Sequence, residues 1–276
     1  MLISHKELQE INNVQTEILK AVSDVCQRLD IRFFMVHGSL LGTIRDHKFV
    51  PDDDDIDIAF FRKDYDLFMQ KAPSMLEKRF FVQNCNTDPG YTLCFGKVRD
   101  SQTTYVIEKA KHITMNHGIY IDVFPIDYCN ESGIRAKLDQ FKLKLFETRI
   151  ASVYDLKEST PKKVIRRCSK LILPSLSATI RWRERLLSSC PERSFVRVSG
   201  GKRTEQCIPK SWFEKALCER FENVDVFIPG EYDKYLTRIY GDYSTRTLVE
   251  DKVSDLENIE INACIVDTQK PYTHYV

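Results

Sequence analysis

The sequence predicts an α+β protein whose first half forms a mixed sheet with flanking helices and whose second half is mostly helical. Short segments rich in branched and aromatic residues, typical of strands, recur through residues 1–130 and alternate with segments of helical periodicity. From Ile134 to about Leu187 the chain becomes basic and helical in period, and the remainder is mixed. At about 150 residues a domain, 276 residues correspond to roughly two domains. We therefore expect a core at residues 1–130 and a helical region at residues 131–276 that completes its pocket.

The first predicted element is a helix of about seven turns. Ser4 and Glu7 form a capping box, and apolar residues recur at steps of three and four up to Leu29. Residues 31–36 follow as a buried strand that ends at His37, and residues 40–45 as a short helix.

The later elements are recognised by the same patterns. Further strands are expected at 56–60, 80–82, 91–98, 103–107 and 118–125, the last one ended by a proline, and near 259–266. Helices are expected at 65–76, in the stretch 134–187 with interruptions at Pro161 and Pro174, and at 232–240. The change after residue 130, from strand-like segments to a basic stretch of helical period, supports a domain boundary there.

The composition excludes several classes of protein. The 41 basic and 40 acidic residues give a net charge of +1, which argues against a general nucleic-acid clamp. No apolar run reaches the length of about 18 residues that a membrane span needs, and the N-terminus lacks a signal-peptide pattern. Nine scattered cysteines without a CxxC motif predict reduced, buried thiols. We expect a cytoplasmic protein, with peripheral association at the inner face of the membrane as an open alternative.

Two neighbouring carboxylates give the first chemical signal. Asp55 and Asp57 alternate with Ile56 and Ile58 on a predicted strand, so both carboxylates point to one face. Like charges this close repel each other, and a hard divalent cation is the usual compensation. Mg²⁺ typically takes one or two carboxylates together with substrate phosphates. The pair therefore predicts a magnesium site, with Mn²⁺ as the alternative ion.

A distant acid and a glycine–serine pair complete the pattern. Asp122 is the one acid in an apolar strand, and a buried acid needs a partner. Gly38 lets backbone approach a ligand closely, while Ser39 and the following helix N-terminus offer N–H groups to phosphate. Glycine, acid pair and distant acid in this order form the sequence pattern of the nucleotidyltransferase fold. We therefore expect a nucleotidyltransferase-like sheet.

Two other interpretations of the acidic run are weaker. An EF-hand calcium loop is excluded, because its sixth position would be Ile58 where the loop requires glycine. A solvated acidic loop accounts for Asp52, but not for acids that alternate with core residues. A metal site therefore explains the pair Asp55 and Asp57 better than either alternative.

The segment from His37 to Ile58 resembles the signature of the LicD family, which comprises phosphocholine transferases and related sugar-phosphate transferases, including fukutin-related protein. Its motif reads HGSLLGTIR, then five residues, then P-x-DDDIDI. The resemblance continues at residues 96–100, 118–125 and 228–243, and so spans most of the chain.

The resemblance implies a CDP-activated donor, such as CDP-choline, and a metal-dependent site. Asp55 and Asp57 match the metal-binding pair of the family, and Asp122 matches its third acid. Asp122 would serve as a metal ligand or as the general base, and Asp53 is the competing base.

Four basic residues are candidates for the donor phosphates. Lys97 and Arg99 match basic residues of the family and, at positions i and i+2, share one face of a strand, which suits a pyrophosphate. A salt-bridge ladder to exposed acids is the alternative. Arg45 and Lys48 lie between the glycine and the acids, where a solvated loop is an equal alternative.

The reaction that the resemblance implies is phosphoryl transfer. A hydroxyl of a cell-surface glycan, or of a lipid-linked saccharide precursor in lipopolysaccharide or capsule biosynthesis, would attack the donor phosphorus and CMP would leave. Two alternatives stay open, namely a nucleotidyltransferase that passes NMP from an NTP to an acceptor and an inactive module that binds glycan or nucleotide. The sequence names neither the transferred group nor the acceptor sugar.

Overall fold

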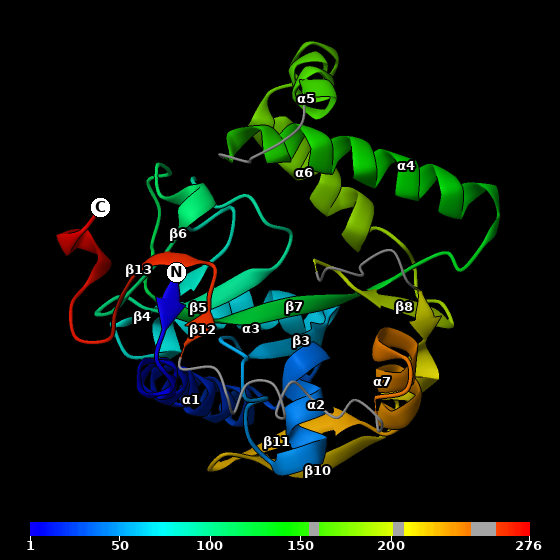
Figure 1. The fold of residues 1–276 in the computed structure, drawn as a ribbon. Coiled ribbons are helices and arrows are strands. Elements are labelled where there is room, and N and C mark those ends of the chain that lie inside the picture. Colours follow the sequence, from blue (N-terminus) through cyan, green and yellow to red (C-terminus); the bar gives the residue numbers. More distant parts are fainter. Residues whose placement is uncertain (155–159, 201–206, 244–257) are drawn as a thin grey trace.

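The structure, a computed structural model, describes residues 1–154, 160–200, 207–243 and 258–276 (Figure 1). Its helices are α1 (His5–Leu29), α2 (His37–Asp46), α3 (Arg62–Met75), α4 (Gly133–Ile150), α5 (Thr160–Ile172), α6 (Leu176–Ser188) and α7 (Tyr232–Tyr240). A mixed seven-stranded sheet lies at the centre, so the predicted α+β class is confirmed.

The central sheet joins strands from both halves of the chain. Its strands follow the order β2-β3-β7-β5-β4, and β8 extends it by pairing with β7 and with β9. They are β2 (Phe34–Met35), β3 (Asp57–Phe61), β4 (Phe80–Gln83), β5 (Gly96–Asp100), β7 (Ile119–Tyr128), β8 (Phe195–Val198) and β9 (Ile208–Pro209). Because β8 and β9 come from beyond residue 131, the later part of the chain contributes strands to this sheet as well as helices. The division at residue 130 stays a prediction.

Three small two-stranded pairings surround the central sheet. They join β1 (Leu2–Ile3) to β12 (Ile259–Glu260), β6 (Thr104–Ile107) to β13 (Ala263–Asp267), and β10 (Ala216–Phe221) to β11 (Val224–Pro229). In the view of Figure 1, α4, α5 and α6 lie above the central sheet, and α1, α2 and the β10–β11 hairpin lie below it.

Helix α1 forms as its sequence predicts. The Ser4 hydroxyl accepts the N–H of Glu7 and the Glu7 carboxylate accepts the N–H of Ser4, which closes the capping box. The helix ends at Leu29, and the next residue, Asp30, caps it in the left-handed conformation. Its apolar face packs against β7 and buries Ile11 and Ile18 completely. This helix therefore supports the strand that contains Asp122.

Several predicted boundaries differ from those of the structure. The strand expected at 31–36 is limited to β2, and α2 already begins at His37, so that Gly38 and Ser39 belong to its first turn. Strand β7 continues past Pro125 to Tyr128, although a proline was expected to end it. Pro125 pairs with Phe60 of β3, and its carbonyl accepts the N–H of Ser199, so the missing proline N–H leaves the strand intact.

The structure also corrects the prediction for the cysteines. Cys129 and Cys207, 78 residues apart in the sequence, are joined by a disulfide, so the expectation that every cysteine is reduced is wrong. Cys168 and Cys218 are exposed rather than buried. None of the helices in the described ranges is both long enough and apolar enough to cross a membrane.

Candidate active site

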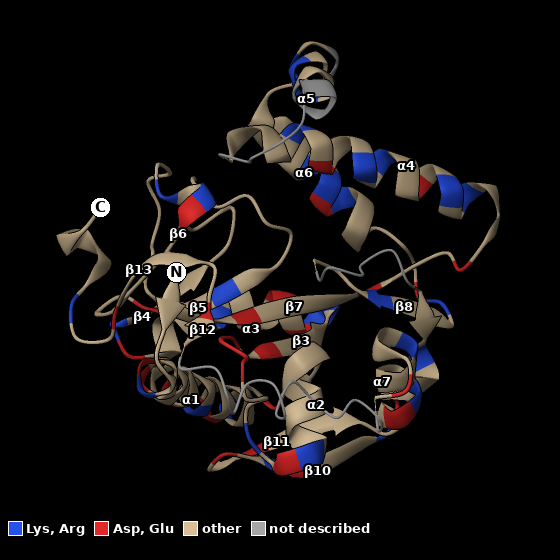
Figure 2. Ribbon diagram, in the orientation of Figure 1, with Lys and Arg blue, Asp and Glu red and all other residues tan. Residues whose placement is uncertain are grey.

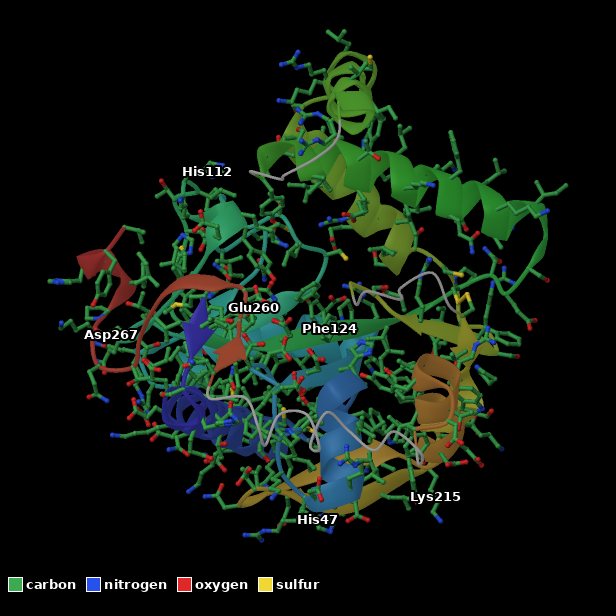
Figure 3. The ribbon with its side chains drawn as sticks, viewed as in Figure 1. His47, His112, Phe124, Lys215, Glu260 and Asp267 are labelled. Atoms are coloured by element: carbon green, nitrogen blue, oxygen red, sulfur yellow. A yellow bond between two sulfur atoms is a disulfide. The ribbon has the colours of Figure 1, made fainter. Side chains whose placement is uncertain are left out.

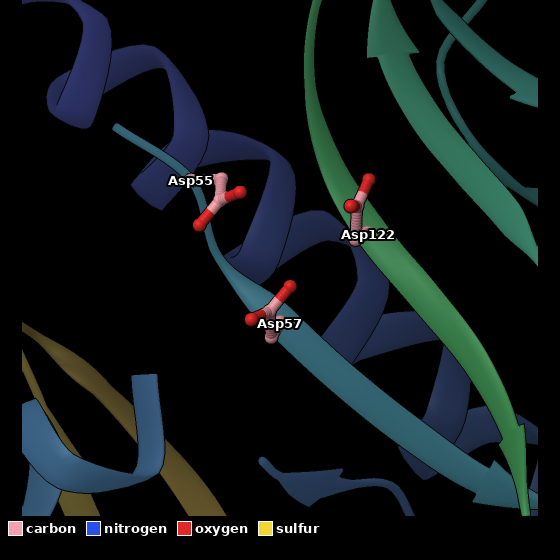
Figure 4. A group of neighbouring side chains, drawn as sticks. All are labelled: Asp55, Asp57 and Asp122. Atoms are coloured by element: carbon pink, nitrogen blue, oxygen red, sulfur yellow. The ribbon is translucent and has the colours of Figure 1, made fainter. Parts of the chain in front are cut away.

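Three carboxylates from two adjacent parallel strands converge at the centre of the molecule. Asp57 begins β3, Asp55 lies two residues before it, and Asp122 lies in β7 directly opposite Asp57 in the strand register. One carboxylate oxygen from each residue lies within 4.8 Å of the other two. Figure 4 shows the three side chains turned toward one another. These three residues are called the acid triad below.

Backbone hydrogen bonds fix the triad in place. The Asp57 N–H donates to the Ser39 hydroxyl over 2.9 Å, and the Asp122 N–H donates to the carbonyl of Ile56 over 2.7 Å. Ser39 is buried, and it joins the first turn of α2 to the start of β3. In this structure Ser39 therefore positions Asp57, although the sequence suggested that it binds phosphate.

Two residues that the sequence analysis missed hold the acidic turn before β3. Gln15 of α1 donates through its side-chain nitrogen to the Asp54 carbonyl (2.7 Å) and to the Tyr120 carbonyl (3.1 Å). The hydroxyl of Tyr105 donates to the Asp54 carboxylate. The role of Gln15 could have been recognised from the sequence, because this polar residue lies four positions after Ile11 and therefore on the apolar face of α1.

The triad concentrates negative charge in a largely buried place. Burial, with the neighbouring acids Asp122 and Asp54, raises the pKa of Asp55 from 3.8 to about 6. Burial raises the pKa of Asp57 well above its usual range, and the charges of Asp55 and Asp122 raise it further. Burial also raises the pKa of Asp122. The three acids therefore lack sufficient positive charge, which is the condition that a bound divalent cation relieves.

Lys97 is the cation that faces the triad. It pairs with Asp122 across the antiparallel β5–β7 ladder, and its ammonium group contacts the Asp122 carboxylate. The ammonium nitrogen also lies 3.3 Å from the ring centroid of Tyr120. Burial lowers the pKa of Lys97 to about 8, although the charge of Asp122 opposes this shift. The predicted cation is thus in the site, where it neutralises part of the triad.

A fourth acid, Asp53, lies against Gly38. A Cβ atom added to Gly38 would be 2.4 Å from an oxygen of the Asp53 carboxylate, which is closer than real Cβ contacts. Burial and the charge of Asp55 raise the pKa of Asp53 well above its usual range, and the two side chains share a hydrogen bond. The absence of a side chain at Gly38 therefore makes room for Asp53. This contact accounts for a glycine at position 38 even when no ligand approaches it.

Arg99 occupies a different environment from Lys97. The residue is 1% exposed, and its guanidinium donates to the Gln83 side chain and to the carbonyl of Gly118, each over 2.6 Å. It also lies 4.7 Å from the ring centroid of Tyr120. Because its donors meet protein acceptors, the structure supports a positioning role for Arg99 beneath the triad rather than the predicted contact with a pyrophosphate.

The structure does not bring Arg45 or Lys48 to the triad. Ser39, near the start of α2, contacts Asp57, whereas Arg45 lies six residues further along, about 9 Å up the helix axis. At the same end of α2, the imidazole of His47 forms a hydrogen bond with the carbonyl of Arg220. This bond docks the C-terminal end of α2 on β10. Figure 3 shows His47 at the lower end of the molecule and Phe124 of β7 at its centre. Lys48 is exposed beyond that end.

The residues present fit a hard divalent cation. The triad supplies oxygen ligands from three side chains within 4.8 Å of one another, which is the ligand chemistry of Mg²⁺ and Mn²⁺. Burial and the neighbouring acids keep the pKa values of Asp55 and Asp57 raised although Lys97 is near. The positive charge of Lys97 therefore does not fully compensate the negative charge of the triad. Among the described residues, this is the group of acids that meets the geometry of a metal site.

A cavity of about 300 Å³ borders the site without enclosing the triad. It lies between α4, α6 and the segment before β5, and its lining includes Phe95, Arg183 and Arg197. The Phe95 ring centroid is 5.5 Å from the ammonium nitrogen of Lys97, so one aromatic ring separates the cavity from the charged cluster. A larger cavity of about 530 Å³, on the α3 side of Phe95, includes no triad residue in its lining.

Comparisons with known proteins match the part of the chain that contains the triad. The family model described as LicD/FKTN/FKRP, nucleotidyltransferase domain, matches residues 30–145, which include all three acids of the triad and Lys97. A relative from Haemophilus influenzae, named lipopolysaccharide cholinephosphotransferase LicD, is 23% identical over 253 residues, which cover 89% of this chain and 94% of the relative. Residues 30–145 are thus similar to the LicD family, and the resemblance inferred from the sequence is confirmed.

Proposed function

We propose that this protein is a phosphotransferase that moves a phosphocholine-like group from a CDP-activated donor to a hydroxyl of a cell-surface glycan or its precursor, releasing CMP. The observation that supports this most is the acid triad, in which carboxylates with raised pKa values meet within 4.8 Å. The name of the Haemophilus relative supports phosphocholine as the group and lipopolysaccharide as the class of acceptor.

Asp55 and Asp57 would hold Mg²⁺ or Mn²⁺ in this proposal. When bound, the ion would offset negative charge on the donor pyrophosphate, which is its general part in phosphoryl transfer. Lys97 adds a fixed positive charge beside the same carboxylates. Because Lys97 is buried and its ammonium lies over the Tyr120 ring, it is held in one place and needs little reorganisation during the reaction.

The acceptor hydroxyl must lose its proton when it attacks phosphorus, and two acids are candidates to take it. Asp122 is held by the Lys97 ammonium, which favours the ionised carboxylate and so weakens it as a base. Asp53 has a pKa raised well above its usual range by burial and by Asp55. We therefore favour Asp53 as the base and Asp122 as a ligand or as the partner of Lys97.

The second candidate function is nucleotidyl transfer from an NTP. The parallel pairing of β3 and β7, with Asp57 opposite Asp122, is compatible with a nucleotidyltransferase-like sheet, and such a sheet serves either reaction. The two functions differ in the donor, a CDP-alcohol or an NTP. Both need the same carboxylates, so substitution of the triad alone does not separate them.

A comparison of donors tests the proposal. Thermal unfolding is measured with CDP-choline, CTP or ATP, each with and without Mg²⁺, on the wild type and on Asp57→Asn as the matched control. We expect CDP-choline to raise the melting temperature of the wild type in a Mg²⁺-dependent manner, and to do so more than ATP. Stabilisation by ATP or CTP alone would favour the nucleotidyltransferase, and no response to any nucleotide would favour an inactive module.

A further inference from the structure

Helix α4 has two faces of different character. One face is buried against the rest of the protein through Ala136, Phe146 and Ile150. The opposite face presents Ile134, Leu138 and Phe141, whose exposed fractions are 80%, 49% and 67%. These three residues follow the spacing i, i+4, i+7, which places them in one stripe along the helix. A single exposed apolar residue is ordinary, but a stripe of three large side chains needs an explanation.

Basic residues border this stripe on both sides. At 100° per residue, Arg135 and Lys142 lie on one side of it, and Lys137 and Lys144 lie on the other. All four are exposed, and no acid in the described ranges forms an ion pair with any of them. Figure 2 shows blue bands, which mark Lys and Arg, along α4.

The acids of α4 lie away from the stripe. Glu147 pairs with Arg183 of α6 over 3.1 Å, on the side of α4 that faces the protein. Asp139 is half-buried, and its carboxylate accepts the side-chain N–H of Asn130. Within α4, the charged residues that border the exposed stripe are therefore all basic.

Helix α5 continues the same kind of surface. It packs against α4 and, in Figure 1, lies at the edge of the molecule far from the central sheet. Val164, Ile165 and Leu171 are 52%, 59% and 88% exposed, and Arg167 and Lys170 lie among them. The exposed apolar residues of the two helices, with their basic neighbours, are together called the α4–α5 outer face. Its apolar members are Ile134, Leu138, Phe141, Val164, Ile165 and Leu171.

We propose that the α4–α5 outer face binds an anionic lipid surface. Apolar stripes with flanking lysines and arginines are typical of helices that lie in the membrane interface, where the apolar side chains enter the acyl boundary and the cations meet headgroup phosphates. Protein interfaces differ, because their buried centres are depleted in lysine. Here Lys137, Lys142 and Lys144 adjoin the apolar side chains directly, so charge complementarity selects anionic lipid over a protein partner or a second copy of the chain.

Vesicle co-sedimentation of the full chain tests this proposal independently of the proposed activity. The probes are vesicles of phosphatidylcholine alone and vesicles that also contain phosphatidylglycerol. Two variants remove the surface: Ile134→Ser/Leu138→Ser/Phe141→Ser removes the apolar stripe, and Lys137→Glu/Lys142→Glu/Lys144→Glu reverses its charge. The matched control is Lys6→Glu/Lys20→Glu/Lys71→Glu, which makes the same charge change at exposed positions of α1 and α3.

We expect the wild type to bind the anionic vesicles and not the neutral ones, with binding that falls as salt is added. The affinity of each outer-face variant for the anionic vesicles should be at least about tenfold lower than that of the wild type. The matched control should bind like the wild type. Circular dichroism should show the same helix content in all variants. Failure of the wild type to bind, or equal loss in the matched control, would overturn the proposal. So would a dimer in lipid-free sedimentation that the apolar variant dissociates, because it would assign the face to a second copy.

Discussion

Replacing Asp55 by asparagine removes one charge from the triad while the side chain keeps its size, and the structure gives the magnitude of the effect. Burial and neighbouring acids raise the pKa of Asp55 from 3.8 to about 6, a change of roughly two pH units. At 1.36 kcal/mol per unit, the ionised carboxylate costs the folded, metal-free protein about 3 kcal/mol. The charge of Asp55 also raises the pKa values of Asp53 and Asp57, so its removal relieves those acids as well.

The direction of the pH dependence follows from the sign of this shift. Because the folded pKa lies above the unfolded one, Asp55 favours the folded state most below about pH 4, and that contribution is lost as the pH rises through about 6. The free energy of unfolding of the metal-free wild type should therefore fall by about 3 kcal/mol through this group between pH 4 and pH 7. The asparagine variant lacks this decrease and should be the more stable protein at neutral pH.

Urea unfolding in the presence of a chelator, at several pH values between 4 and 8, measures the effect on both proteins. Addition of Mg²⁺ in place of the chelator should stabilise the wild type at neutral pH and the variant much less, because the ion replaces the missing positive charge. A variant that is less stable than the wild type at neutral pH, with an unchanged dependence on pH, would refute the electrostatic account of the triad.

Three further substitutions test the other members of the site. Lys97→Ala, with Lys97→Met as the control that keeps the volume, should weaken binding of CMP and of the CDP-donor about tenfold in calorimetric titration, and unchanged affinity would make Lys97 purely structural. Gly38→Ala should displace the Asp53 carboxylate, which lies 2.4 Å from the new Cβ atom, and so lower turnover about tenfold or more; wild-type turnover would show that Asp53 is not needed where it lies. Asp122→Asn should raise the Mg²⁺ concentration needed for half-maximal turnover if Asp122 is a ligand, whereas a rate that stays low at every Mg²⁺ concentration, with the acidic limb of the pH profile lost, would make it the base.

Local pattern was sufficient for the elements whose neighbours lie close in the sequence. The capping box and apolar steps of α1 predicted a helix that the structure forms from His5 to Leu29. The alternation of acids with Ile56 and Ile58 placed both carboxylates on one side, and Asp55 does face Asp57 even though it precedes β3. In both cases the chemistry of the side chains and the backbone period agree.

The register between strands that are distant in the sequence could not be predicted from the sequence. The contact between Lys97 and Asp122 depends on the antiparallel pairing of β5 with β7, and no local pattern specifies which residues oppose each other. Arg45 is close to the acids in the sequence, but it lies at the end of α2 that docks on the β10–β11 hairpin, away from the triad. The pairing of Cys129 with Cys207 likewise joins residues 78 positions apart.

The central claim, that the acid triad supports transfer of a phospho-alcohol group from a CDP-activated donor, is tested most directly by product analysis. Purified protein is incubated with CDP-choline, Mg²⁺ and a glycan acceptor, and CMP and phosphocholine-bearing glycan are quantified together by mass spectrometry. We predict equal amounts of both products from the wild type, dependence on Mg²⁺, and turnover about a hundredfold lower in Asp57→Asn, which corresponds to about 3 kcal/mol in the barrier. Full activity of Asp57→Asn, or transfer of a nucleoside monophosphate from an NTP with CDP-choline inert, would contradict the account.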